Sequence, residues 1–169
     1  MRILWMKDGF CSYCGERFVD QQWPRRCGNC DNLTFRNPIP VVVVLLPAFS
    51  GLVVVRRGVM PHAGKLALPG GYIEWGETWQ QAAARELAEE TRITLDPDAI
   101  QPFQVHSAPD GTLLIFGLAA PWRGPLPPFT PTPESPERLI MMAPTELAFP
   151  LHTQVMRAYF AAPSAPSSS

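Results

Sequence analysis

The chain has 169 residues, a formal net charge of −1 and 46% hydrophobic residues. This length is enough for one ordinary core with a small accessory unit, and the charge is too small to indicate a polyanionic partner. The sequence has no apolar run of membrane-spanning length, and its first residues lack the form of a signal peptide, so we expect a cytoplasmic protein without a membrane partner.

The first chemical pattern in the chain is a pair of CxxC motifs. Cys11 and Cys14 are followed, after twelve intervening residues, by Cys27 and Cys30. Four thiolates with this spacing are typical of one tetrahedral site, for which Zn²⁺ is the usual ion and iron a variant. The alternatives are two disulfides, which the expected cytoplasmic location disfavours, or one redox-active pair, which the duplicated spacing disfavours. We therefore predict a structural zinc ribbon over residues 1–37.

Many zinc ribbons bind nucleic acid, but the charge of this one argues against that role. Residues 1–37 carry only a slight excess of basic side chains, and four thiolates around a divalent ion offset it. The aromatic residues of the segment are better explained as the cover of a core too small to form alone. Nucleic acid is therefore not an expected partner.

The rest of the chain predicts several strands and two helices. The expected strands cover residues 41–46, 52–55, 65–68, 103–106, 112–120 and 139–142. The first two strands are joined through Ser50-Gly51, which suggests a hairpin. The expected helices cover residues 78–91 and 150–160. Residues 162–169 have nothing to bury and are expected to be disordered.

The predicted helix at residues 78–91 carries three glutamates on one face. Glu86, Glu89 and Glu90 stand at positions i, i+3 and i+4, where side chains are neighbours and like charges repel. Clusters of carboxylate oxygens suit hard divalent cations such as Mg²⁺ or Mn²⁺ rather than zinc. The alternative is a solvated acidic face, against which the glycine-containing loop before the helix and its alanine-rich opposite side both argue.

The segment over residues 71–93 resembles the Nudix box, the signature of hydrolases that cleave nucleoside diphosphates linked to another moiety. The matching residues are Gly71, Glu77, Arg85, Glu86, Leu87, Glu89, Glu90 and Ile93. One position departs, because the family has glycine where this chain has Arg92. A glycine there ends the helix with a positive φ, so arginine should cost about 1 kcal/mol or move the helix end by one residue.

This resemblance implies an α/β (α+β) fold for residues 38–161, in which an α/β/α sandwich surrounds a mixed sheet. It also implies Mg²⁺ or Mn²⁺ bound by Glu86, Glu89, Glu90 and the carbonyl of Gly70, with water attacking phosphorus. Arg85 and Glu77 would form a supporting ion pair. A carboxylate from a later loop completes such sites in related enzymes. Glu137 is the first choice for it and Glu134 the second, against the alternative that both are solvated loop charges.

The ribbon before "RNPIPVVVV" and the box together resemble two Nudix groups. NADH pyrophosphatases have a further motif that recognises NADH, and "HSAPDGTLLIFGLAAPW" lacks it. A zinc-ribbon group that includes plant FAD and ADP-ribose pyrophosphatases matches better, through "LPGGYIEWGE", "PES" and "LAFP". The resemblance thus implies FAD, ADP-ribose or a similar substrate. The alternatives are NADH or an NAD cap, and a non-catalytic module that binds a nucleotide or a protein.

Residues in and before the box are candidates for contacts with the substrate. Arg56, Arg57 and His62 are expected to contact phosphate. The candidates for stacking on adenine or flavin are Trp75, Tyr72, Trp79 and Phe49, against the alternative that each belongs to the core. The expected partner is a nucleotide-type small molecule, and a homodimer stays open.

Overall fold

The structure is a computed structural model that describes residues 8–19 and 22–162. The chain divides into two compact units, Met1–Pro38 and Ile39–Ser169, and each is described by itself. The predicted disorder at the C-terminus falls, except for residue 162, outside the described residues.

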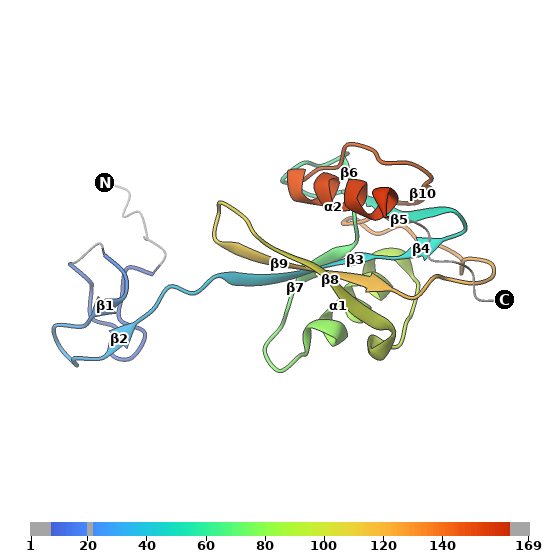
Figure 1. Cartoon of the computed structure of the whole chain (residues 1–169). Coiled ribbons are helices and arrows are strands. Elements are labelled where there is room, and N and C mark those ends of the chain that lie inside the picture. Colours follow the sequence, from blue (N-terminus) through green and yellow to red (C-terminus); the bar gives the residue numbers. More distant parts are fainter. Residues whose placement is uncertain (1–7, 20–21, 163–169) are drawn as a thin grey trace. The chain divides into compact units, whose positions relative to one another are not determined.

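The N-terminal unit is a minimal sheet with two cysteine-containing turns. Strands β1 (Arg25–Arg26) and β2 (Leu33–Thr34) pair antiparallel (Figure 1). Among residues 8–19 and 22–38, the buried cluster of this unit consists of Cys11, Phe18 and Cys27. A core with one aromatic ring removes too little apolar surface from water to hold such a unit together. The unit therefore needs another source of stability.

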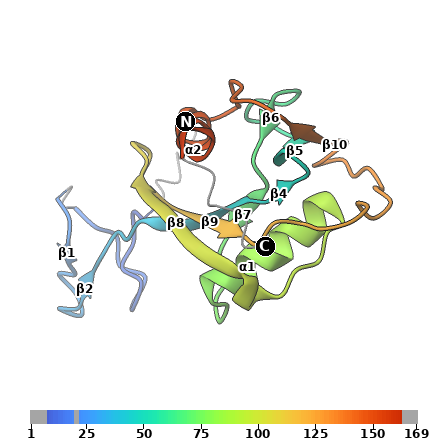
Figure 2. The same cartoon turned by 45° about the vertical axis from the view of Figure 1, so that its right-hand side comes forward.

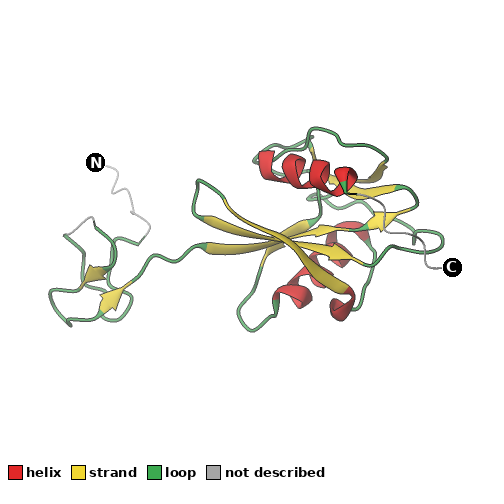
Figure 3. Ribbon diagram, viewed as in Figure 1, coloured by secondary structure: helices red, strands yellow, loops and turns green. Residues whose placement is uncertain are grey.

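The larger unit contains two four-stranded sheets (Figure 3). The first is mixed and has the order β7-β3-β9-β8, with β7 (Gly70–Tyr72), β3 (Ile39–Leu45), β9 (Thr112–Ala119) and β8 (Ile100–Ser107). Its central strands β3 and β9 are parallel, and the two outer pairings are antiparallel. The second sheet is antiparallel and has β5 (Gly51–Arg56) bonded to β10 (Glu137–Met141), β4 (Pro47–Ala48) and β6 (Leu66–Ala67).

Helices α1 (Trp79–Thr91) and α2 (Pro150–Ala161) lie on opposite sides of the mixed sheet (Figures 1 and 2). Alternate residues of β3 serve the two sides: Val42 and Val44 pack in the cluster that contains α1, and Val43 and Leu45 in the cluster that contains α2. Because successive side chains of a strand point to opposite faces, a strand covered on both faces has to be apolar throughout. The predicted sandwich of helices around a mixed sheet is confirmed.

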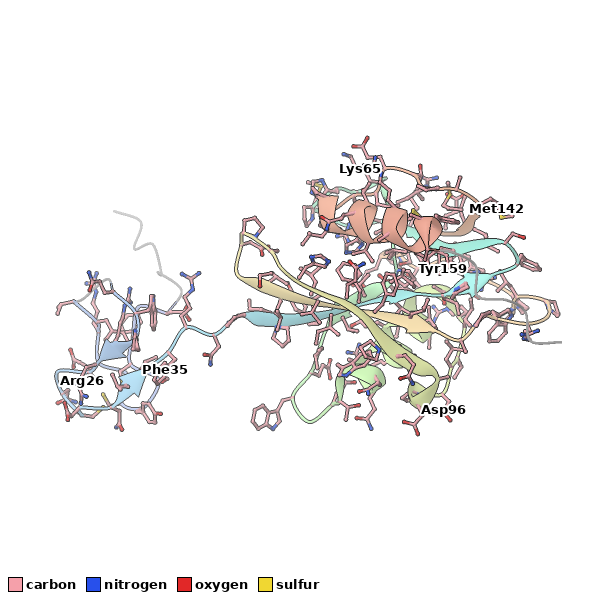
Figure 4. The ribbon with its side chains drawn as sticks, viewed as in Figure 1. Arg26, Phe35, Lys65, Asp96, Met142 and Tyr159 are labelled. Atoms are coloured by element: carbon pink, nitrogen blue, oxygen red, sulfur yellow. The ribbon has the colours of Figure 1, made fainter. Side chains whose placement is uncertain are left out.

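Two labelled side chains mark the two sides of the mixed sheet. Asp96, which caps the short 3-10 helix η1 (Pro97–Ala99) after α1, and Tyr159 of α2 lie on opposite sides of the mixed sheet (Figure 4).

No helix within residues 8–19 and 22–162 combines the length and the apolar character needed to cross a bilayer.

The hairpin predicted between residues 41–46 and 52–55 forms at its closed end, where β4 pairs antiparallel with β5 and the N–H of Val53 donates to the carbonyl of Leu46 at 3.0 Å. Residues 41–45 do not take part in it. Strand β3 lies in the mixed sheet and bonds to β7 and β9, whereas β5 belongs to the second sheet and its hairpin partner is the two-residue strand β4. Both edges of β3 are already used by its neighbours in the mixed sheet. The chain therefore crosses from one sheet to the other at Leu46 and folds back only after β4.

Helix α1 has specific signals at both ends. Thr78 Oγ1 accepts from the N–H of Gln81, and Gln81 Oε1 accepts from the N–H of Thr78, which forms a capping box. At the other end Arg92 has φ 62° and donates its N–H to the carbonyl of Ala88. Of the two outcomes expected for this position, the helix ends where a glycine would end it, and the arginine bears the strain.

Replacing Arg92 by glycine should stabilise the protein. The left-handed conformation costs a residue with a Cβ about 1 kcal/mol, which glycine does not incur. Urea unfolding of Arg92→Gly should show a free energy of unfolding raised by about that amount. Arg92→Ala removes the same charge but keeps the Cβ, so it should show no such gain. An equal gain in both variants would assign the effect to charge and contradict this reading of the helix end.

Candidate functional site

Two glycines of β7 make close contacts: Gly70 with the neighbouring strand β3, and Gly71 with Glu86 of helix α1. A Cβ on Gly70 would lie 2.2 Å from the carbonyl oxygen of Val42, and a Cβ on Gly71 would lie 2.5 Å from the carboxylate of Glu86. Neither contact tolerates a side chain. The carboxylate of Glu86 is therefore pressed against the backbone of β7, and its side chain is 15% exposed.

The guanidinium of Arg85 joins the acidic residues to one another. Its Nε and Nη2 donate to the two carboxylate oxygens of Glu77 at 2.8 and 3.0 Å. Its Nη1 lies 2.7 Å from Oε1 of Glu86 and 3.4 Å from Oε2 of Glu89, and Nη2 also donates to the carbonyl of Tyr72. The ion pair between Arg85 and Glu77 is present, and it lowers the pKa of Glu77. The same arginine also holds two of the three helix glutamates.

Glu90 lies against the start of β7 and has a perturbed carboxyl group. Its Oε2 accepts from the N–H of Gly70 at 2.9 Å. Burial raises the pKa of Glu90 to about 7, and the nearby Glu86 carboxylate acts in the same direction. Burial also raises the pKa of Glu86. Two adjacent carboxylates in a partly desolvated place repel each other, a situation that a hard cation relieves.

Two more charged residues act on Glu90 from distant parts of the chain. The Arg57 guanidinium lowers its pKa and the Glu134 carboxylate raises it. Glu134 is held near by the loop after β5, because its carbonyl accepts from the N–H of Gly58 at 2.7 Å. A Cβ on Gly58 would lie 1.8 Å from the carbonyl of Pro133, so this contact requires glycine. The site is thus assembled from α1 and two separate loops.

The other predicted loop carboxylate has a different partner. Glu137 is the first residue of β10, and its Oε2 accepts from Nε of Arg56 at 2.7 Å. Arg56 also donates to the carbonyl of Gly64. The two residues therefore neutralise each other at the β5–β10 pairing.

The three helix glutamates are less tightly gathered than the cysteines. Within the described part of the chain, the four cysteines are the one group of Cys, His, Asp or Glu residues whose ligand atoms could enclose an ion. Arg85 draws Glu86 and Glu89 towards itself, while the N–H of Gly70 holds Glu90. The donor set is nonetheless all oxygen, on adjacent turns of one helix, and this chemistry fits Mg²⁺ or Mn²⁺.

A cavity of about 700 Å³ lies beside Glu90. Most of its wall is apolar and comes from β3, β9, the segment around β6 and the start of α2. The predicted candidates Arg57 and Tyr72 line it together with Gly70 and Gly71. Of the three helix glutamates, Glu90 lies in the cavity wall.

Other predicted substrate contacts do not line this cavity. Trp75 is fully exposed in the loop before α1, and Phe49 is also exposed. Trp79 packs in the core beside Gly117. His62 is exposed and contacts the ring of Phe149 edge to face. In these positions Trp75 and His62 lie outside the cavity wall.

Sequence reasoning missed two residues of the cavity wall, Phe149 and His152. Phe149 belongs to the "LAFP" segment and is the N-cap of α2, and His152 lies in the first turn of this helix. A single histidine in an amphipathic helix gives no signal in the sequence, because its role depends on what packs around it. The guanidinium of Arg57 lies over the Phe149 ring, 5.0 Å from its centroid.

The four cysteine sulfurs of the N-terminal unit form a compact cluster. All four lie within 4.8 Å of one another, with 3.7 Å between Cys11 and Cys30 and 3.5 Å between Cys14 and Cys27. A tetrahedral site with Zn–S bonds of about 2.3 Å has S–S edges of about 3.8 Å. The backbone and side-chain N–H groups of Asn32 lower the pKa of the Cys30 thiol. All four cysteines are free, and their sulfurs are arranged to bind one metal ion.

Comparisons with known proteins agree with this geometry. Residues 36–162 match the NUDIX domain. The NAD-capped RNA hydrolase NudC of Edwardsiella ictaluri is 33% identical over 86 residues, which cover 50% of this chain and 33% of that protein. The chain thus spans about a third of the length of this curated relative.

Two solved structures extend the comparison. A NUDIX hydrolase from Nitrosomonas europaea superposes with a TM-score of 0.73 and 26% identity, over 89% of both chains. A bifunctional NMN adenylyltransferase/ADP ribose pyrophosphatase from Francisella tularensis, complexed with AMP and a Mn ion, superposes with a TM-score of 0.54 and 29% identity. That match covers 63% of this chain and 34% of the other.

Removing the charge of Arg85 should destabilise the fold more than removing an exposed charge does. Arg85→Gln leaves Glu77 and Glu86 side by side without their shared cation, at an expected loss of about 1–2 kcal/mol. Arg92→Gln is the matched control, because Arg92 is exposed and follows the same helix. Urea unfolding of both variants measures the difference. Equal losses would mean that Arg85 does not hold the acidic cluster together.

Proposed function

The chain belongs to the Nudix family, and we propose that it hydrolyses the pyrophosphate bond of a nucleoside diphosphate linked to another moiety, of the ADP-ribose or FAD kind. The observation that carries this proposal is the position of Glu90 and Arg57 in the wall of a cavity of about 700 Å³, with the Glu86 carboxylate against Gly71 of the same wall. Pockets of this size are typical for small organic ligands. The name of the Francisella tularensis relative, an ADP ribose pyrophosphatase, supports the choice of substrate.

The residues that would hold Mg²⁺ or Mn²⁺ are Glu86, Glu89, Glu90 and the carbonyl of Gly70. The all-oxygen donor set and the Mn ion in the Francisella tularensis relative support this assignment. When bound, a divalent cation neutralises the diphosphate and activates a water for attack on phosphorus. Glu89, whose side chain is 60% exposed, is open to that water and to its proton.

Other residues of the site would bind the diphosphate or position the glutamates. Arg57 lines the cavity, and its contacts with the carbonyl of Pro61 and the ring of Phe149 hold its positive charge beside Glu90. There it would attract the negative diphosphate. Arg85 positions Glu86 and Glu77, and Gly71 leaves the space that the Glu86 carboxylate needs.

We assign the carboxylate that completes the site to Glu134 rather than to Glu137. Glu134 acts on the charge of Glu90, and its loop is fastened to Gly58. Glu137 is neutralised by Arg56, and this ion pair supports a structural role for both residues.

The cysteine cluster is proposed as a structural zinc site, with iron as the variant. The sulfur separations are close to the edge of a Zn(Cys)₄ tetrahedron. Four thiolates fill the coordination sphere and leave no position for water, so this ion would hold the small unit together without chemistry.

A second candidate substrate is an NAD-type dinucleotide or NAD cap, because the Edwardsiella ictaluri relative is an NAD-capped RNA hydrolase. The same bond would be cut in a larger substrate. A non-catalytic module is disfavoured, because all three box glutamates are present. A homodimer and a cytoplasmic location remain expectations from the sequence.

Neutralising the box glutamates should abolish most of the turnover. Removing one carboxylate weakens the electrostatic stabilisation of the transition state, so Glu86→Gln and Glu90→Gln should each lower kcat by about 100- to 1,000-fold. Glu134→Gln should have an intermediate effect, and Glu137→Gln a smaller one. The assay is hydrolysis of ADP-ribose, FAD and NADH with Mg²⁺ or Mn²⁺, with circular dichroism to verify folding.

The exposed Glu146→Gln is the control for this series, because it removes the same charge far along the chain from the box. Turnover within about threefold of the wild type in both Glu86→Gln and Glu90→Gln would sink the proposed site, given that electrostatic groups of this kind are worth far more. No turnover of any substrate by folded, metal-loaded wild type would favour a binding module.

Losing a cysteine should affect folding before it affects chemistry. Cys14→Ser and Cys27→Ser should lower the solubility or the melting temperature, while kcat per folded molecule stays close to the wild type. Elemental analysis of freshly purified wild type should find one zinc or iron per chain. Absence of both metals, or loss of turnover in fully folded variants, would refute a purely structural metal.

A further inference from the structure

The imidazole of His152 is the polar group in the cavity wall that the proposed mechanism leaves unexplained. The residue is 6% exposed and lines the cavity. Within the described residues, its Nδ1 is buried and has no hydrogen-bond partner. Buried polar atoms are nearly always paired, and leaving one unpaired destabilises the fold. A partner that the chain itself does not supply would explain the arrangement.

Neighbouring rings fix the imidazole in this wall. The Phe116 ring meets it edge to face, with 5.7 Å between ring centroids, and the Phe149 ring lies 5.0 Å away at a tilt of 49°. Phe149 is in turn covered by the guanidinium of Arg57. His152 therefore cannot swing out to water to satisfy its nitrogen without breaking these contacts.

The imidazole is neutral at physiological pH. Burial lowers the pKa of His152 to about 3, and the positive charge of Arg57 adds to this effect. The acidic residues of the wall are Glu90, on the side of the proposed metal site, and Asp110, in the turn between β8 and β9. A neutral imidazole has one donor and one acceptor nitrogen. This chemistry suits the edge of an uncharged heterocycle, whereas a phosphate would be drawn to Arg57.

The remaining wall suits a flat ring better than a sugar. It contains aliphatic side chains on several sides, including Val41 and Val43 of β3, Leu114 of β9 and Leu68. A sugar would bring several hydroxyl groups that need partners, whereas a nucleobase buries two apolar faces and needs polar partners only at its edge. A mostly apolar wall with a few neutral polar side chains, which are Tyr72, Ser107, Thr112 and His152, matches the second case.

We propose that His152 is a specificity-determining residue of this chain, which hydrogen-bonds the edge of the nucleobase of the substrate. The base would lie in the cavity against Phe149 and the valines of β3, and the diphosphate would extend to Arg57 and Glu90. The proposal rests on the proposed function and adds to it the part of the substrate that this cavity selects.

The binding of two probes distinguishes the contribution of the base from that of the sugar phosphate. AMP and ribose 5-phosphate share the sugar phosphate and differ in the base, and calorimetry gives their dissociation constants without any turnover. The wild-type chain should bind AMP more tightly than ribose 5-phosphate. His152→Leu should weaken AMP binding by about tenfold, the value of one buried hydrogen bond, and leave ribose 5-phosphate within about twofold.

His106→Leu is the matched control. His106 also packs edge to face on Phe116, but its ring is hydrogen-bonded to Gln104 and does not line the cavity. The His106→Leu variant should bind both probes as the wild type does. Equal loss of both probes in His152→Leu, or no loss of AMP, overturns the proposal, as does a wild type that does not prefer AMP.

A second measurement covers the case in which His152→Leu does not fold. In wild-type chain labelled with ¹⁵N-histidine, AMP should shift the ring nitrogen resonances of His152, and ribose 5-phosphate should not. Unchanged resonances at saturating AMP overturn the proposal. If turnover is present but AMP leaves His152 unaffected, only this proposal fails. If AMP is selected through His152 but no substrate is cleaved, only the proposed hydrolysis fails.

Discussion

The shared ion pair of Arg85 with Glu77, Glu86 and Glu89 is the interaction on which the site depends. Three glutamates within five positions of a helix repel one another, and Glu86 is largely buried as well. One guanidinium with several donors in a fixed plane can satisfy several carboxylates at once, which a lysine could not do with the same geometry. Through the carbonyl of Tyr72 it also ties α1 to β7. The acidic helix can therefore lie against the sheet, with Glu90 in the wall of the cavity.

Segments that are distant in the sequence contribute the other residues of the site. Gly71 leaves room for Glu86 of the helix beside β7, Gly70 lets β7 lie close to β3, and Gly58 fastens the loop that carries Glu134. The start of α2 brings Phe149 and His152 to the other part of the same cavity. In the proposed function the two parts have separate tasks. The charged side acts on the diphosphate, and the apolar side holds the base.

Local patterns in the sequence predicted the elements but not their assembly. The apolar run at residues 41–46 and the alanine-rich helix were predictable, since burial and helical periodicity are encoded locally. The CxxC spacing likewise predicted the sulfur cluster. The predicted hairpin formed only between β4 and β5, and not along β3, because the partner of a strand depends on which neighbours already occupy its edges. The environments of Glu134, Glu137 and His152 depend on contacts between segments far apart in sequence, and no local pattern encodes them.

Equilibrium binding of Mn²⁺ tests most directly whether these glutamates form a cation site. Electron paramagnetic resonance measures free Mn²⁺ during titration of the substrate-free protein, and wild type should bind it at a site that Glu90→Gln weakens by at least about tenfold, as loss of a charged ligand requires. Glu146→Gln should leave the affinity unchanged. A wild type that binds no Mn²⁺, or an affinity that Glu90→Gln does not alter, would contradict the account and leave the three glutamates as a solvated acidic face held by Arg85.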